Sequence, residues 1–525
     1  MDRPGTARSR SLGAGSPVVP STVLTDRLRM HRGAPPGEVR WAAYPAVLRR
    51  TLEILQAFSP EVRDAFLYTC SALFAGIAAL AMGIPLYRQW GQLAVGPYAA
   101  ASVLMIVVAL RRAALSRRGP VAPPAGEGPD PAPPPAAGRR RWKVARVTAF
   151  LIVLFGATIV PLALEVVWRS EGDAALHVQP EVLVVEQAGA RAAHGEDPYR
   201  VVDRNGHILI HEHSEPIYEL YYPYLPGMVV FGFSTGSKVE ARLTDARIQF
   251  LLFTAIISVW ALSRLRPPTD ARVRALQILT VLPTAALPLA TGGDDMPVVA
   301  LMLLGLVALQ RRRPLLAGLA LGAASSLKFT AWPVALLALW GASDRSRRRA
   351  MGWYALGVGV VMGPVVLPVA LSNPTAFIDN VVRFPLGLAG VSSPAASALP
   401  GHILVAAFPG IHRAYVVAVV VVGGALLVWR LRRRPPGDAP EVASLAGWVM
   451  LIAIMLAPAT RVGYLLYPIN LFIWAWMLRQ AEEPDPLPLP PGETAQLSSG
   501  SSNTSSEKVV EPVEVVGDTV APTSQ

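Results

Sequence analysis

Charged residues are scarce in this sequence. Asp, Glu, Lys and Arg make up 16% of its 525 residues, whereas hydrophobic residues make up 52%. Soluble domains carry about a quarter charged residues. The shortage argues against a soluble enzyme and predicts a chain that lies in a lipid bilayer.

The sequence also has a single cysteine and shows no pattern of a cleavable leader or of a nucleotide-binding loop. The one cysteine, Cys70, can form no intrachain disulfide, and we expect it to pack inside the first apolar segment. That segment begins near Ala65, too far along the chain for a signal peptide, so we expect it to be retained. No Gly-rich nucleotide loop and no Rossmann-like strand pattern is present, so nothing predicts a nucleotide site.

Long apolar runs are abundant, and a run of about 18 uncharged residues can cross the hydrocarbon core. Clusters of Arg lie between them, and the positive-inside rule assigns these clusters to the cytoplasm. The net charge of +12 is therefore explained by orientation, without a nucleic-acid partner. An all-α polytopic protein with about ten transmembrane helices and both termini in the cytoplasm is predicted. The predicted spans are 66–87, 93–110, 147–167, 247–264, 273–290, 297–310, 350–371, 413–430, 443–460 and 464–478.

Two apolar segments do not fit as simple crossings. Residues 225–234 are too short to span a bilayer. Residues 314–340 have Arg clusters at both ends. Each is predicted to be a re-entrant or interfacial hairpin, which a membrane tolerates where protein or water satisfies the broken backbone.

The remaining segments complete a division into five parts. Pro-, Gly- and Ser-rich composition predicts disorder at both ends of the chain. The parts are a disordered cytoplasmic N-terminus (1–60), two N-terminal spans (61–110), a Pro-, Gly- and Arg-rich cytoplasmic linker (111–142), a membrane domain with an extracytoplasmic loop at 168–224 (143–480), and a disordered cytoplasmic tail (481–525).

The loop 168–224 is chemically unlike the rest of the chain. It holds ten of the 36 acidic residues and five of the eight histidines. A solvated outer loop would have such a composition, but loops on a rigid scaffold also commonly carry active sites. His207, His211 and His213 lie close to Glu212 and Glu215, but the segment lacks the HExxH motif of a helical zinc site, so no metal site is assigned.

Apolar residues at helical spacing predict a short amphipathic helix over 181–193, lying on the membrane surface and ended by Gly195 and Asp197-Pro198. Its apolar positions are Val182, Val185, Gly189 and Ala192. Glu181 starts this helix, where a carboxylate is stabilised by the helix N-terminus and can act as a general base for a sugar hydroxyl. Helix capping is the alternative role.

Charges at membrane depth are costly, so each is a functional candidate. Asp294 and Asp295, at the outer ends of two spans, can bind a hydroxylated substrate or a divalent cation. Lys328 lies in the middle of 314–340 without an acidic neighbour in sequence, and we expect it to contact a lipid phosphate.

Arg461 stands at the outer end of a span beside Tyr464 and Tyr467. Its planar guanidinium suits a phosphate headgroup with an apolar tail. Arg383, in another outer loop, is a candidate of the same kind. The alternative for both is an interfacial Arg that reaches toward water.

Several segments together resemble the bacterial polyprenyl-phosphate-sugar-dependent glycosyltransferases of the C superfold. Within that group the chain looks most like glycosyltransferase family eighty-seven, the alpha-mannosyltransferase-like integral membrane proteins of actinobacteria. The likeness covers roughly residues 145–480. The segments are EVLVVEQAGARAAHGEDPY, YYPYLPGM, GGDDMPVVALMLLGL, LAGLALGAASSLKFTAWP and RVGYLLYP.

The resemblance implies a C-type glycosyltransferase fold and transfer of a sugar, such as mannose, from polyprenyl phosphate to an envelope lipid or glycan, with inversion, at the bacterial plasma membrane. In that family a loop carboxylate, usually Asp, eight residues before a glycine acts as the base. Here the position is Glu181, with Gly189 as the glycine. Asp173 and Glu186 are the alternates.

In this hypothesis Asp294 and Asp295 hold the sugar or the acceptor, while Lys328, Arg461 and Arg383 hold the lipid phosphate. A transporter or flippase of lipid-linked sugars would share the charges and broken helices, but it predicts symmetric halves, and no inverted repeat is visible. A non-catalytic envelope-assembly protein is a third alternative, raised by Glu in place of Asp.

Overall fold

The computed structural model describes residues 58–117, 136–172, 174–199, 217–236, 241–265, 269–342, 347–389, 391 and 394–481. Within these residues the regular structure is helical, and the only β pairing is an isolated bridge between Ala396 and Thr460. This confirms the all-α prediction for the described part of the chain. The predicted disordered N-terminus and tail, most of the linker, Asp173 and the His207 to Glu215 group lie outside it.

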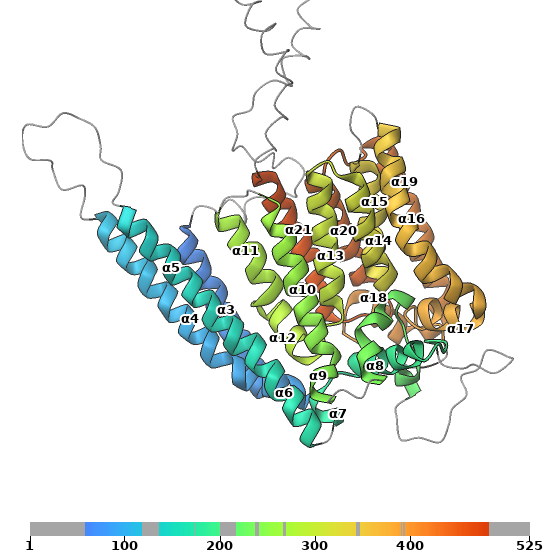
Figure 1. Ribbon diagram of the computed structural model, residues 1–525, viewed down its shortest axis with the longest axis horizontal. Helices are drawn as coiled ribbons and strands as arrows, with labels where there is room; N and C mark the ends of the chain where they lie inside the picture. The colour runs from blue at the N-terminus through green and yellow to red at the C-terminus, as the bar shows by residue number, and fades with distance from the viewer. Residues whose placement is uncertain are drawn as a thin grey trace, which may run out of the picture. The chain divides into compact units, whose positions relative to one another are not determined.

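Eight helices in the described residues are long and apolar enough to cross a membrane (Figure 1). They support a polytopic membrane protein. One of them contains a π-helical segment, η2, and another is interrupted before Pro283. Their elements are α3 (Pro60–Ala81), α4 (Pro85–Arg117), α5 (Ala136–Val153) with η2 (Leu154–Ile159) and α6 (Val160–Glu171), α10 (Ala246–Ser263), α11 (Thr269–Thr280) with α12 (Pro283–Thr291), α16 (Arg347–Ser372), α19 (His412–Arg433) and α20 (Ala439–Leu456).

Two of the predicted spans are shorter than a normal crossing. The segments 297–310 and 464–478 correspond to α13 (Asp295–Gln310, 16 residues) and α21 (Leu466–Gln480, 15 residues). At 1.5 Å per residue each is about 24 Å long or less, whereas a hydrocarbon core is about 30 Å thick. Helix length therefore supports eight of the ten predicted crossings in the described residues.

The predicted span 66–87 was wrong at its C-terminal end. Helix α3 ends at Ala81, Met82 is already extended, and α4 starts at Pro85. The apolar composition continues through this turn, so hydropathy alone did not reveal it. Cys70, expected to be packed, is exposed on α3.

The hairpin expected over 314–340 is present as two helices. Helix α14 (Pro314–Leu327) ends at the extended residue Lys328, and α15 (Trp332–Gly341) runs back after the short η5 (Phe329–Ala331). Gly341, at the end of α15, lies against Val442 and against Leu309 near the end of α13. Helix α15 therefore returns to the level at which α13 ends and α14 begins. Lys328 is thus the tip of the hairpin.

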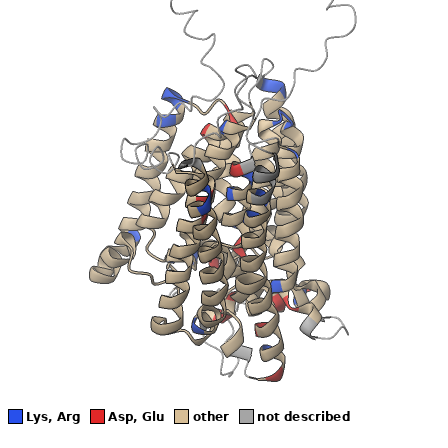
Figure 2. Cartoon of the chain, turned by 90° about the vertical axis from the view of Figure 1, so that its left-hand side faces the viewer, with Lys and Arg blue, Asp and Glu red and all other residues tan. Residues whose placement is uncertain are grey.

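The Arg clusters that the structure describes share one end of the helices. Arg112 pairs with Glu61, and Arg146 pairs with Asp64 and Asp270 near the same helix ends. Arg311 donates to the carbonyl of Arg264. Figure 2 shows Lys and Arg at the upper ends of several helices. This arrangement agrees with the single-sided Arg distribution, while the assignment of that side to the cytoplasm remains a prediction.

The N-terminal helices α3 to α6 form their own core, which includes residues of α12. Tyr68, Trp90 and Tyr98 lie fully buried in this core. Helix α11 is interrupted before α12, and the carbonyls freed there accept hydrogen bonds from the hydroxyls of Thr158 and Tyr98. The N-terminal helices therefore satisfy polar groups that a broken membrane helix would otherwise leave unpaired.

At the opposite end from the Arg clusters, helix α8 (Pro180–Ala193) packs on η4 (Pro226–Gly236). The predicted helix 181–193 and its apolar face are confirmed, since Val182 and Val185 are fully buried. Segment η4 covers the predicted short segment 225–234. The two backbones meet at Gly189 and Gly232, where a Cβ on Gly189 would lie 2.3 Å from the Gly232 backbone.

We therefore expect Gly189→Ala to lower the melting temperature in detergent by several degrees, because the added methyl group meets backbone that cannot turn away. Overpacking of this kind costs about 1 to 3 kcal/mol. Gly359→Ala in α16 is the matched control, since nothing lies within 4 Å of a Cβ there. Equal melting temperatures for the two variants would show that α8 and η4 are not held this closely.

Candidate active site

Lys328, Asp294 and Asp295 form a buried ion cluster. The Lys328 Nζ lies 3.0 Å from Asp294 Oδ2 and 2.5 Å from Asp295 Oδ1. The aspartates stand at the start of α13 and Lys328 follows α14, so the cluster lies where short helices end. The ammonium is paired with two carboxylates that lie 34 and 33 residues earlier in the sequence. It also stands between the oxygens that a divalent cation would need.

Aromatic side chains enclose the cluster. The Tyr467 hydroxyl donates to Asp295 Oδ1 at 2.6 Å and accepts from Thr330 at 2.6 Å. The Lys328 ammonium lies 5.0 Å from the centre of the Tyr224 ring and 5.8 Å from that of Tyr464, within cation–π distance. The ammonium is therefore held by carboxylates and ring faces together.

Glu181 lies in the first turn of α8, as predicted, and its Oε1 forms an ion pair with Arg461. Its Oε2 is buried and has no hydrogen-bond partner among the residues that the structure describes. One carboxylate oxygen is thus held by a cation, while the other keeps its capacity to accept a proton.

The backbone around Arg461 is fixed by a crossing segment. Thr460 pairs with Ala396 in the isolated bridge, and the Val462 amide donates to the Ser397 hydroxyl at 3.1 Å. Burial alone would lower the pKa of Arg461, but the Glu181 carboxylate raises that pKa above its ordinary value. The guanidinium therefore stays charged and points at Glu181.

Two tyrosines connect the Glu181 pair with the Lys328 cluster. Tyr224 lies close to Asp294 and Glu181, and Tyr464 lies close to Lys328 and Arg461. The structure therefore brings together, at one end of the helices, seven residues that the sequence had proposed separately. They are Glu181, Asp294, Asp295, Lys328, Arg461, Tyr464 and Tyr467.

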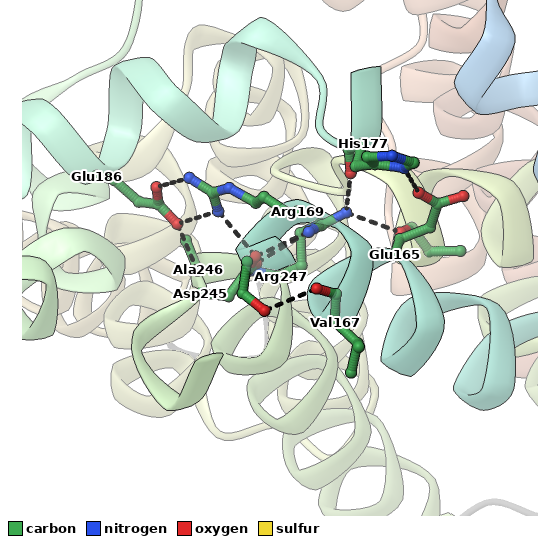
Figure 3. A network of polar contacts seen from close by, with 10 residues as sticks. Glu165, Val167, Arg169, His177, Glu186, Asp245, Ala246 and Arg247 are labelled. Carbon is green, nitrogen blue, oxygen red and sulfur yellow. Dashed lines mark hydrogen bonds and ion pairs between the residues drawn. The ribbon is translucent and has the colours of Figure 1, made fainter. Parts of the chain in front are cut away.

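The alternate base Glu186 belongs to a different set of contacts (Figure 3). Its oxygens accept from Arg169 at 2.6 and 3.0 Å, and one also accepts from the Ala246 amide. Arg169 and Arg247 in turn donate to Asp245. Both oxygens of Glu186 are occupied, so its carboxylate fixes α8 to α6 and α10 and is poorly suited to accept a proton from a substrate.

Asp245 and His177 extend this network to the segment before α8. Burial alone would raise the pKa of Asp245, but hydrogen bonds from Arg247 and Arg169 hold it below its ordinary value. Arg247 also donates to the His177 carbonyl at 2.8 Å. The start of α8, and with it Glu181, is thereby held against the membrane helices.

Arg383 does not join the site. It lies in the π-helical segment η6 (Asp379–Arg383), is 55% exposed and pairs with Asp379 at 2.7 Å. No group of three or more His, Cys, Asp or Glu that could hold a metal ion occurs among the described residues. Asp173 and the loop histidines lie outside them.

Tyr87 and Gln179 are two residues of this site that the sequence did not predict. The Gln179 amide nitrogen donates to the Tyr87 hydroxyl at 3.0 Å and to Thr291 Oγ1 at 2.8 Å. A Cβ on Gly292 would lie 2.3 Å from Gln179 Oε1, so a larger residue there would displace the Gln179 side chain. The useful signal was position, since Gln179 directly precedes Pro180 and Tyr87 lies two residues after Pro85, and each of these prolines starts a helix.

These features define a polytopic membrane protein with a polar site at the ends of short helices. Residues 240–458 match the family model of glycosyltransferase family 87. The matched segment contains Asp294, Asp295 and Lys328, and lacks Glu181 and Arg461. No curated protein and no solved structure matches this chain. The comparisons therefore support a glycosyltransferase family 87 domain, and the C-type fold remains a prediction.

Proposed function

We propose that this chain is a membrane glycosyltransferase that transfers a sugar from a polyprenyl-phosphate donor to an envelope lipid or glycan on the extracytoplasmic face of the bacterial plasma membrane, with both chain termini in the cytoplasm. The observation that carries the proposal is the buried Oε2 of Glu181 beside Arg461, which has no hydrogen-bond partner in the described part of the chain. The family match supports sugar transfer. The apolar helices support a donor that arrives from the lipid phase.

In the proposed reaction the acceptor oxygen attacks the anomeric carbon of the donor sugar. The new bond forms as the bond between that carbon and the phosphate oxygen breaks, and polyprenyl phosphate leaves with the electron pair. Glu181 Oε2 takes the acceptor proton, as a general base does. Attack opposite the leaving group inverts the anomeric configuration.

Arg461 serves the leaving phosphate in this proposal. A guanidinium binds phosphate through paired N–H donors, and it stabilises the negative charge that grows as the bond breaks. A donor phosphate would compete with Glu181 for Arg461. Donor binding would then loosen the ion pair and release the carboxylate for its role as base.

The Lys328 cluster is proposed to bind the sugar. Two carboxylates beside ring faces suit sugar hydroxyls, while Lys328 keeps the carboxylates ordered and partly neutralised. Because Lys328 is occupied in this way, the phosphate is assigned to Arg461. Arg383 is left without a catalytic task.

The test supplies wild-type membranes with radiolabelled polyprenyl-phosphate sugars, mannose among them, and an extract of envelope lipids. We expect label to pass into the extract, and none to pass from nucleotide sugars in membranes freed of polyprenyl phosphate. Failure with every polyprenyl-phosphate sugar would refute the proposal. Movement of the lipid-linked sugar across vesicles without transfer would instead indicate a transporter.

A further inference from the structure

The helices α3 and α4 lie outside the family match, yet the start of α4 reaches the candidate site. Tyr87 lies in the first turn of α4, directly after the turn that joins it to α3. It lies close to Glu181 and Arg461, and its hydroxyl accepts from Gln179, two residues before Glu181 in the chain. A residue from the N-terminal pair of helices is therefore a neighbour of the proposed base.

The hydrogen bonds around Gln179 fix which way each group donates. The Thr291 hydroxyl donates its proton to the Leu287 carbonyl at 2.8 Å, so it can only accept from Gln179. The group of Gln179 that faces Thr291 is therefore its NH₂, and the second N–H of this group points to the Tyr87 oxygen.

Tyr87 consequently accepts from Gln179 and keeps its own hydroxyl proton. In the part of the chain that the structure describes, no acceptor for that proton is recorded. A free phenol O–H beside a carboxylate suits one ligand group in particular. A sugar hydroxyl can accept from the phenol and at the same time donate to the carboxylate.

We propose that Tyr87 is a substrate-binding residue that donates a hydrogen bond to a sugar hydroxyl next to Glu181, so that the α3–α4 pair forms one wall of the site. The inference rests on the proposed function. The sugar hydroxyl belongs either to the donor or to the acceptor. Gln179 is the positioning residue that orients the phenol.

The test compares wild type, Tyr87→Phe and Tyr415→Phe in the radiolabel transfer assay, with donor and acceptor concentrations varied separately. Tyr415 is the matched control, because its hydroxyl donates to the Leu456 carbonyl on other helices. Loss of one hydrogen bond to substrate is expected to raise one KM about five- to tenfold in Tyr87→Phe, with kcat within about twofold. The substrate whose KM rises identifies the hydroxyl.

A second measurement distinguishes substrate binding at position 87 from an effect of the substitution on folding. Cys70→Ser removes the one cysteine, and Tyr87→Cys in that background is labelled with a membrane-impermeant maleimide. The donor or the acceptor lipid should slow labelling at least about threefold, as expected for a site that is occupied at saturating ligand.

Three results would overturn the inference alone. Unchanged KM and kcat in Tyr87→Phe would leave Tyr87 a structural role. A lower kcat with unchanged KM would mean that Tyr87 acts in the transition state and not in substrate binding. Labelling that neither substrate slows would place Tyr87 away from the bound substrates. In each of these cases transfer by wild type still upholds the proposed function. Absence of transfer by wild type refutes that function and this inference with it.

Discussion

Glu181→Gln is expected to lower the rate of sugar transfer by about a thousandfold, within the range of about 10² to 10⁴ that general bases contribute. The amide has nearly the shape of the carboxylate but cannot accept the acceptor proton. Protein stability should change little, because the Glu181–Arg461 pair is partly exposed (18% and 29%) and such pairs contribute little. The measurement is the initial rate of label transfer at equal amounts of membrane protein.

Glu441→Gln is the control for this substitution. Glu441 lies in the first turn of α20, at the Arg-cluster end of the helices, where it accepts from the Gly437 amide. The Glu441→Gln variant should transfer sugar at the wild-type rate. Glu181→Asp should retain part of the activity, since it keeps the carboxylate but withdraws it by one methylene group. Equal rates for wild type and Glu181→Gln would remove Glu181 from the mechanism.

Much of the candidate site could be predicted because each of its residues breaks a local rule of membrane sequences. Asp294, Asp295 and Lys328 are charges in apolar surroundings. Glu181 starts a helix whose buried face is predicted by the spacing of its apolar residues. Such signals need only a few neighbouring residues. The hairpin at 314–340 followed from a similarly local fact, namely Arg clusters at both of its ends.

The partners of these residues could not be predicted, because pairing depends on how distant helices pack. Lys328 meets aspartates 33 and 34 residues away, and Arg461 meets Glu181 across 280 residues. Tyr87 was missed for a different reason. The predicted span 66–87 treated the turn after Ala81 as membrane helix and so hid the start of α4. Hydropathy averages over such turns, whereas a proline places the helix start.

Lys328→Met is expected to destabilise the protein by about 3 to 5 kcal/mol, as removal of one partner from a buried ion pair does. The substitution leaves the Asp294 and Asp295 carboxylates buried side by side without a cation. In wild type these side chains are only 8% and 13% exposed, so water cannot replace the ammonium. Thermal unfolding in detergent measures the effect, and Lys143→Met, at an exposed position of α5, is the control.

Addition of Asp295→Asn to Lys328→Met separates stability from activity. The double variant restores the cluster's net charge of −1, since wild type has one cation and two carboxylates there. We expect it to regain most of the lost stability and to transfer sugar at less than about a hundredth of the wild-type rate, because the ordered carboxylate pair that is proposed to hold the sugar is gone. Recovery of transfer along with stability would mean that Lys328 and Asp295 only hold the helices together. A Lys328→Met protein as stable as wild type would mean that the two carboxylates do not need the ammonium at all.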